Sequence, residues 1–152
     1  GKYGKWFPEL LKEKGVDLDI CKNVHINEYL SNMPTCLAAA DLCICRAGAI
    51  SLSEIQVQGK PAILIPSPNV AENHQYHNAM ALVRNNAAEI IEEKDLNGER
   101  LIKTVKQLIN NPIKLKEFER NLKNMAIFDS CDRIYKVIKD VLSESKKTVC
   151  TS

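Results

Sequence analysis

The feature that most constrains the fold is a pair of short apolar runs separated by a helical pattern. The first run, Leu42–Cys45, leads into three small residues, Ala-Gly-Ala, at positions 47–49. A helical pattern follows over Ile50–Gln58 and ends at Gly59. The second run, Pro61–Ile65, is continuously apolar, as parallel strands covered on both faces are. The stretch therefore predicts a strand–helix–strand unit with parallel strands.

The rest of the chain extends this alternation. We expect a strand at Ala87–Ile91, one or two strands within Val16–Ile26, and helices at Trp6–Lys14, Pro34–Ala40, Asn73–Asn85, Asn97–Asn110, Ile113–Met125 and Cys131–Ser145. The last helix has apolar residues at core-facing spacing: Ile134, Val137, Ile138, Val141 and Leu142. Residues 146–152 are expected to fray. The pattern predicts an α/β fold, a Rossmann-like parallel sheet with flanking helices.

Composition excludes several classes of protein. A net charge of +2, 5% aromatic residues and no dense basic run argue against nucleic-acid binding. No apolar segment approaches the roughly 18 residues that span a bilayer. The six cysteines include Cys43 and Cys45, which face the same way along one apolar strand, and no C-x-x-C pair occurs. We therefore expect reduced thiols in a cytosolic protein.

Three loops are candidate sites, because ligands of open parallel sheets bind outside the carboxyl ends of the strands. They are residues 46–51, 66–72 and 29–33. In the first loop, small side chains allow a ligand to approach the backbone. The helix that follows offers unpaired N–H donors and a partial positive charge. This combination suits a phosphate group.

Glu54 has two readings. Ser51-Leu52-Ser53-Glu54 fits the S-x-x-E capping box, in which the carboxylate bonds the N-terminal N–H of its own helix. Alternatively, a carboxylate one turn into a phosphate-binding helix can accept two hydrogen bonds from a ribose diol. The local pattern alone favours the capping box.

A second polar cluster covers residues 72–79. His74, Gln75 and Asn78 offer donors and acceptors for sugar hydroxyls, or they belong to a capped helix with a solvated first turn. His74 and His77 lack a third ligand at suitable spacing, so we expect no metal. Arg46 either pairs with a phosphate group or supports its own loop, and we favour the role in supporting the loop. No G-x-S-x-G nucleophile motif or P-loop occurs.

The two clusters, in this order and spacing, resemble the C-terminal half of the MurG family of bacterial glycosyltransferases. The resemblance rests on "AADLCICRAGAISLSEIQVQGKPAILIPSP" followed by "NHQYHNA", and it runs from about Val24 to Leu142. This family transfers N-acetylglucosamine from UDP-GlcNAc to lipid I, forming lipid II during peptidoglycan synthesis. It has the GT-B fold, with two Rossmann-like domains across a cleft, and its C-terminal domain holds the donor.

The resemblance assigns roles to residues of this chain. The backbone of Leu30 would meet the uracil, the helix start at residues 49–53 would face the diphosphate, and Glu54 would bind the ribose. His74 and Gln75 would hold the sugar hydroxyls. The UDP-GlcNAc-binding residues would thus be Leu30, Ala49, Ile50, Ser51, Leu52, Ser53, Glu54, His74 and Gln75, supported by Tyr29, Arg46, Gly48 and Asn78. No cofactor or metal is implied.

Parts of the family pattern are missing from this sequence. The T-G-G-T-G-G-H loop of the family's N-terminal domain and the Gly-Gly-Ser loop after the first strand of its C-terminal domain do not occur in these 152 residues. Residues 1–152 thus correspond to a partial UDP-sugar-binding domain without the acceptor domain or first strand. We expect no catalytic residue here and no sugar transfer by this chain alone. By resemblance, the parent protein is cytoplasmic, peripheral on the membrane's cytoplasmic face, and inverts the donor's anomeric carbon.

Two alternatives remain open. One is the donor-binding subunit of a split UDP-GlcNAc transferase. The other is a non-enzymatic nucleotide-binding α/β module. His74, Gln75 and Asn78 distinguish a UDP-GlcNAc transferase from a plain nucleotide-binding module, because the module would use these residues only for helix capping.

Overall fold

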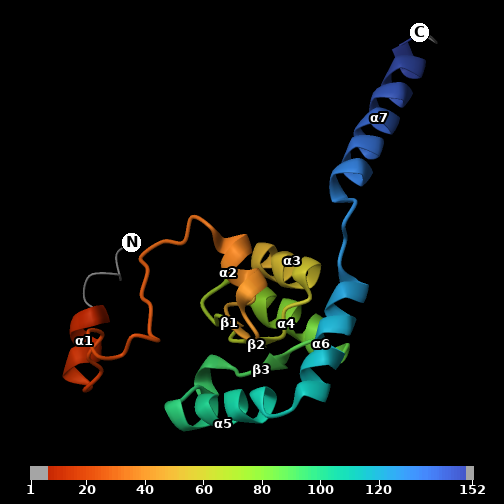
Figure 1. The fold of residues 1–152 in the computed structure, drawn as a ribbon. Helices are drawn as coiled ribbons and strands as arrows, with labels where there is room; N and C mark the ends of the chain where they lie inside the picture. The colour runs from red at the N-terminus through yellow and green to blue at the C-terminus, as the bar shows by residue number, and fades with distance from the viewer. Residues whose placement is uncertain (1–6, 150–152) are drawn as a thin grey trace. The chain divides into compact units, whose positions relative to one another are not determined.

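The computed structural model describes the backbone of residues 7–149 and the side chains of residues 7–143. The chain forms two compact units, residues 1–36 and residues 37–152. In the first unit, helix α1 (Phe7–Glu13), labelled in Figure 1, is followed by a turn. Gly15 in this turn has a left-handed φ of 79°. The Gly15 N–H donates to the Lys12 carbonyl at 3.0 Å, which closes the helix as a C-terminal glycine does.

The strands expected within Val16–Ile26 do not form, and this expectation was wrong. The backbone turns there: the Asp17 carbonyl accepts from the N–H of Cys21 at 2.8 Å, and an Asp17 carboxylate oxygen accepts from the N–H of Asp19 at 2.9 Å. Aspartate often bonds the backbone two residues on, and this favours a turn over an extended chain. The apolar alternation suggested a strand, but alternation alone supplies no neighbouring strand to pair with.

The second unit contains a three-stranded parallel sheet in the order β1-β2-β3, so the predicted fold class is confirmed. Ile44 of β1 pairs with Ile63 of β2, which pairs with Glu89 of β3. Figure 1 shows α3, α4, α5 and α6 around the strands. In chain order the elements are α2 (Met33–Ala39), which crosses the division between units, β1 (Cys43–Cys45), α3 (Ala49–Gln58), β2 (Ala62–Leu64), η1 (Ala71–Asn73), α4 (His74–Arg84), β3 (Glu89–Ile90), η2 (Glu93–Asp95), α5 (Gly98–Ile109), α6 (Pro112–Met125) and α7 (Ser130–Val149).

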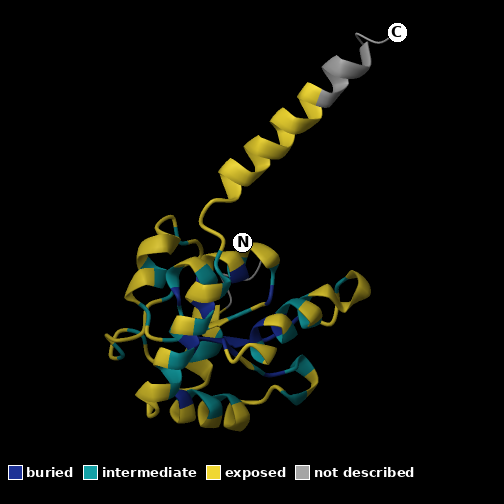
Figure 2. Ribbon diagram, turned by 90° about the vertical axis from the view of Figure 1, so that its right-hand side faces the viewer, coloured by how far each residue is buried: buried dark blue, intermediate teal, exposed yellow. Residues whose placement is uncertain are grey.

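The central strand β2 is buried on both faces, as its continuous apolar sequence predicts. Leu64 packs in one cluster with Leu52 of α3 and Leu122 of α6. Ile63 points to the opposite face, where it joins a cluster with Phe118 of α6. Figure 2 shows the buried residues concentrated at the sheet and the helices beside it. This core holds the carboxyl ends of the strands in place.

The end of α3 depends on Gly59. Its φ is 62°, a left-handed value that favours glycine. A Cβ atom there would lie 2.6 Å from the Cε of Lys123 on α6, so glycine also allows the two helices to approach. Lys60, the next residue, donates from Nζ to the carbonyls of Ala38 and Ala40 at 2.7 and 3.0 Å. A cation at the C-terminal end of α2 also suits the helix dipole.

Helix α7 differs from expectation in two ways. It continues to Val149, past Ser145, because no Gly or Pro interrupts residues 146–149; residues 150–152 of the expected frayed tail lie outside the described residues. The side chains predicted to face the core are instead exposed, from Ile138 at 50% to Val137 at 61% (Figure 2). Helical spacing identifies an apolar side of a helix, but it does not identify what covers that side.

The described cysteines Cys21, Cys36, Cys43, Cys45 and Cys131 are free thiols, and Cys150 lies outside the described residues. Within residues 7–149, no helix combines the length and the apolar character needed to cross a membrane.

Candidate functional site

The start of α3 carries open backbone donors. Its N-cap is Gly48, which is extended (φ −71°, ψ 144°) and has no side chain to cap the helix. The N–H groups of residues 49–51 have no acceptor within the helix. Apart from its chain neighbours, no heavy atom lies within 4 Å of a Cβ built on Gly48, so a ligand can approach the backbone closely at this position. This is the geometry that accepts an anion at a helix start.

The capping box predicted at Ser51–Glu54 does not form. The helix begins at Ala49, two residues before Ser51, so Ser51 lies inside the first turn instead of at the N-cap. Ser53 donates from Oγ to the Ala49 carbonyl at 3.0 Å. Glu54 is exposed in the next turn. The capping reading is thus removed, and the carboxylate is accessible to a ligand.

The remaining residues of this segment differ in exposure. Ile50 is 78% exposed at the helix start, whereas Leu52 is 5% exposed and belongs to the core. The side chain of Leu52 therefore holds the helix on the sheet, and its N–H donates to the Gly48 carbonyl at 3.0 Å.

The start of α4 forms the second side of the site. Two left-handed residues, Glu72 and Asn73, precede it, each with a φ of 51°. His74 is exposed, and its Nδ1 lies 2.9 Å from the Ala71 carbonyl. A carbonyl can only accept, so this contact places the proton on Nδ1 and leaves Nε2 as the acceptor of a neutral ring.

Gln75 and Asn78 hold loops in place. Gln75 accepts at Oε1 from the N–H of Ser67, in the loop after β2, at 2.9 Å. Asn78 donates from Nδ2 to the carbonyl of Ala47, in the loop after β1, at 3.3 Å. Neither residue caps α4, whose N-cap is Asn73. The expectation that a plain nucleotide binder would use them only for capping was therefore wrong, because both already have a structural role.

Arg46 connects the carboxyl ends of three strands. It follows β1, donates from Nη1 to the Ile65 carbonyl after β2 at 3.3 Å, and forms an ion pair with the carboxylate of Glu93 after β3. Sequence reasoning missed Glu93, which lies 47 residues from Arg46. The only signal available was its position just after a predicted parallel strand.

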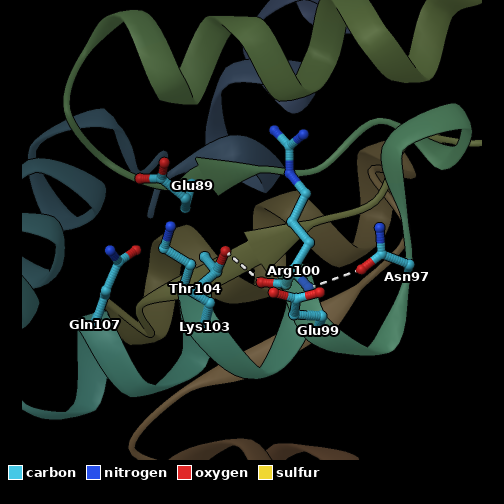
Figure 3. Close-up of a pocket in the computed structure, with 7 residues that line it drawn as sticks. All are labelled: Glu89, Asn97, Glu99, Arg100, Lys103, Thr104 and Gln107. Atoms are coloured by element: carbon cyan, nitrogen blue, oxygen red, sulfur yellow. Dashed lines mark hydrogen bonds between the residues drawn. The ribbon is translucent and has the colours of Figure 1, made fainter.

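Two hollows lie near the sheet. One of about 380 Å³ borders the start of α4 and is lined by Pro66, Pro68, Asn73, Tyr76, Glu92, Glu93 and Lys94. A larger one, of about 480 Å³, lies against α5 and is lined by Glu89, Asn97, Glu99, Arg100, Lys103, Thr104 and Gln107 (Figure 3). None of the residues predicted to bind UDP-GlcNAc lines either hollow, so the hollows do not identify the site.

The two residues predicted at the uracil, Leu30 against its edge and Tyr29 beside it, belong to the first unit. Tyr29 is 84% exposed and Leu30 is partly buried. All the others, from Arg46 to Asn78, belong to the second unit. Across residues 7–149, no three His, Cys, Asp or Glu side chains gather as metal ligands.

Strand β1 carries two thiols, Cys43 and Cys45. Burial, and to a smaller extent the neighbouring Cys43, raise the pKa of Cys45 to about 11. Burial also raises the pKa of Cys43, although Lys60 partly opposes this. Both groups are therefore protonated at neutral pH and act as small apolar side chains.

The fold and site define a class: a Rossmann-like α/β domain with an open helix start at the carboxyl edge of its sheet. Residues 3–141 match the family model described as "Glycosyltransferase family 28 C-terminal domain", and the chain belongs to this family.

Curated relatives share one name, UDP-N-acetylglucosamine–N-acetylmuramyl-(pentapeptide) pyrophosphoryl-undecaprenol N-acetylglucosamine transferase. The protein of Thermoanaerobacter sp. (strain X514) is 46% identical over 132 residues, which are 87% of this chain and 36% of that protein. The protein of Acetivibrio thermocellus is 44% identical over 120 residues, 79% of this chain and 32% of that protein. This chain thus spans about a third of the length of the curated relatives it matches.

The crystal structure of Acinetobacter baumannii MurG is a structural neighbour. The two align with a TM-score of 0.71 and 27% sequence identity, over 76% of this chain and 35% of that chain. The sequence-based resemblance to the MurG family is confirmed by these matches, and so is the expected likeness to the C-terminal domain of a GT-B glycosyltransferase.

Proposed function

We propose that this chain binds the donor UDP-GlcNAc for an inverting N-acetylglucosaminyltransferase that converts lipid I to lipid II. The observation that carries the proposal is the uncapped start of α3, with open space at Gly48 and an exposed Glu54 one turn further on. The family and the names of the relatives support this choice of donor and acceptor.

In this proposal, the diphosphate lies against the N–H groups of residues 49–51. Hydrogen bonds to these donors and the helix dipole stabilise negative charge. The charge on UDP increases as the bond to the sugar breaks, so the same donors favour departure of UDP. The helix and the loop that precedes it orient these donors before the UDP-sugar arrives.

Glu54 and the start of α4 recognise the two ends of the donor. The Glu54 carboxylate accepts hydrogen bonds from both ribose hydroxyls, which are charge-assisted and therefore strong. Gln75 uses Oε1 for the N–H of Ser67, and its amide nitrogen serves as the donor to a sugar hydroxyl. His74 supplies Nε2 as an acceptor beside it.

The proposal assigns the donor to this chain and the acceptor to the rest of the parent enzyme. Lipid I, transfer itself, and location on the cytoplasmic face of the membrane belong to the parent. Turnover of lipid I by this chain alone would contradict that division.

Calorimetry with UDP-GlcNAc and its 2′-deoxyribose analogue tests the role of Glu54. We expect the wild-type chain to prefer the ribose form, and Glu54→Ala to bind that form about 10- to 100-fold more weakly, as for loss of a charged hydrogen bond of about 1–3 kcal/mol. The variant should lose the preference between the two ligands.

Glu99→Ala, an exposed glutamate in the first turn of α5, is the matched control and should bind both ligands as wild type does. Equal affinity of the wild-type chain for the two ligands would exclude the ribose role of Glu54. UMP binding as tight as UDP-GlcNAc binding would favour a plain nucleotide module instead.

A further inference from the structure

Glu93 and Arg46 meet across the end of the central strand. Arg46 leaves β1, Glu93 lies at the start of η2 beyond β3, and the Ile65 carbonyl between them accepts from the same guanidinium at 3.3 Å. We propose that Glu93 is a positioning residue: by holding Arg46, it fixes the loop of residues 46–49 so that the start of α3 faces the diphosphate. This inference rests on the proposed function for its ligand.

Core packing of Ala47, which is fully buried, holds the middle of that loop, and polar contacts hold its two sides. Asn78 holds the Ala47 carbonyl at 3.3 Å from one side, and Arg46 ties the other side to β2 and β3. Gly48, between these anchors and the helix, has no neighbour within 4 Å of its Cβ position. The two flanking anchors therefore act together with the buried Ala47 to set the direction of the first N–H groups of α3. Losing one anchor lets the loop shift around Ala47.

The ion pair itself adds little to folding stability. The Arg46 side chain is 51% exposed and that of Glu93 is 38% exposed, and exposed ion pairs typically stabilise a fold only slightly. Substitution of Glu93 should therefore leave the core intact. Its effect should appear in the loop and in ligand affinity.

A positioning role and a simple charge effect of Glu93 predict opposite changes in UDP-GlcNAc affinity when the residue is removed. If Glu93 only offset the charge of Arg46, its removal would leave a freer cation and strengthen binding of a diphosphate. If Glu93 positions the loop, its removal weakens binding because the N–H groups lose their fixed direction. The sign of the change therefore separates the two roles.

Glu92 is the matched control. It lines the same hollow as Glu93, but its carboxylate pairs with Lys94 at 3.0 Å. Glu92→Ala removes the same charge from the adjacent position and leaves the Arg46–Glu93 pair in place. It should change neither the loop nor donor affinity.

The test uses NMR of the free protein and calorimetry on wild type, Glu93→Gln, Glu93→Ala, Arg46→Ala and the double variant. We expect Glu93→Gln and Glu93→Ala to shift the amide resonances of residues 47–51 without ligand. UDP-GlcNAc affinity should fall about three- to fivefold while uridine, which lacks phosphate, binds as before. Glu93→Ala should add no further loss to Arg46→Ala, because it acts through that residue.

Unshifted loop amides in both Glu93 variants would overturn the inference, and so would tighter UDP-GlcNAc binding or additive losses in the double variant. If the wild-type chain binds no UDP-GlcNAc, the proposed function fails. The amide shifts then still decide whether Glu93 positions the loop.

Discussion

The helices of the second unit begin in two different ways. Helices α5 and α6 begin with asparagine caps: Asn97 accepts from the N–H of Arg100 at 2.8 Å, and Asn111 accepts from that of Lys114 at 3.0 Å. Helices α3 and α4, which follow β1 and β2, begin without any capping side chain. The same sheet therefore supports two helix starts closed by the chain itself and two that remain open.

The capped helix starts contribute to the stability of the fold, whereas the uncapped starts are available for ligand binding. An asparagine cap satisfies a backbone donor and stabilises a helix by about 1 kcal/mol. A glycine at the N-cap gives up the side-chain bond and leaves the donors to a ligand. Helix α3 instead relies on its core side chains, such as Leu52 and Ile55, which are 5% and 1% exposed. We infer that the open starts mark the donor site and the capped starts mark the supporting frame.

The largest expected effect concerns the core that holds the open helix. Leu122 of α6 is fully buried in the cluster that includes Leu52 and Ile55 of α3. Leu122→Ala should lower the free energy of unfolding by about 2–5 kcal/mol through lost burial and a cavity. Urea unfolding measures this change. Ile113→Ala, 81% exposed on the same helix, is the control and should change stability by less than about 0.5 kcal/mol. Equal effects would show that α3 is not held by its core.

The second prediction closes the open start. Gly48→Asp places a capping carboxylate at an extended, uncrowded position, so stability should rise by a few tenths of a kcal/mol. UDP-GlcNAc affinity should fall more than about tenfold, because the new charge repels the diphosphate. Unfolding and calorimetry measure the two changes. Gly98→Asp adds the same charge to the capped start of α5 and should leave affinity unchanged. Unchanged affinity in Gly48→Asp would contradict the assignment of the diphosphate to α3.

The third prediction opens a closed start. Asn111→Ala removes the side chain that accepts from the Lys114 N–H, and should lower the free energy of unfolding by about 1 kcal/mol. Donor affinity should stay at the wild-type value, because α6 supports the fold only. Asn110→Ala, at the adjacent position, is the control for the loss of an exposed asparagine. A loss of donor affinity in Asn111→Ala alone would break the division between the two kinds of start.

The smallest expected effect concerns β1, the strand that leads into α3. Burial raises the pKa of Cys45 to about 11, above the 9.0 of an ordinary thiol, so the folded state keeps a proton that the unfolded state loses. The free energy of unfolding should therefore fall as pH rises from about 9 to 11. Cys45→Ala should flatten this slope, whereas Cys131→Ala, at an exposed position, should not. Identical slopes in wild type and Cys45→Ala would contradict the burial of the Cys45 thiol.

The sequence predicted the elements whose causes are local. The strand at β2 and the helices α5 and α6 follow from apolar runs, periodicity and stop signals, and all three form. The strands expected within Val16–Ile26 failed, because a strand needs a partner that alternation cannot supply. The spacing of apolar residues identified the apolar side of α7, but it did not predict that this side is exposed.

The candidate site divides in the same way. The sequence located the loop at positions 46–51 and the polar start of α4. The capping-box pattern placed the N-cap at Ser51, three residues after the observed N-cap Gly48, because the same pattern also occurs inside this helix. The sequence could not predict the partner of Arg46, because Glu93 lies 47 residues away and only folding brings the two together.

The most direct test of the central claim is an NMR titration of the ¹⁵N-labelled chain with UDP-GlcNAc. We predict that the amide resonances of Ala49, Ile50 and Ser51 shift saturably as donor binds, while those of Arg100 and Lys114, already bonded to asparagine caps, stay in place. Shifts at Arg100 and Lys114 with none at residues 49–51 would contradict the account and place the ligand elsewhere on the domain.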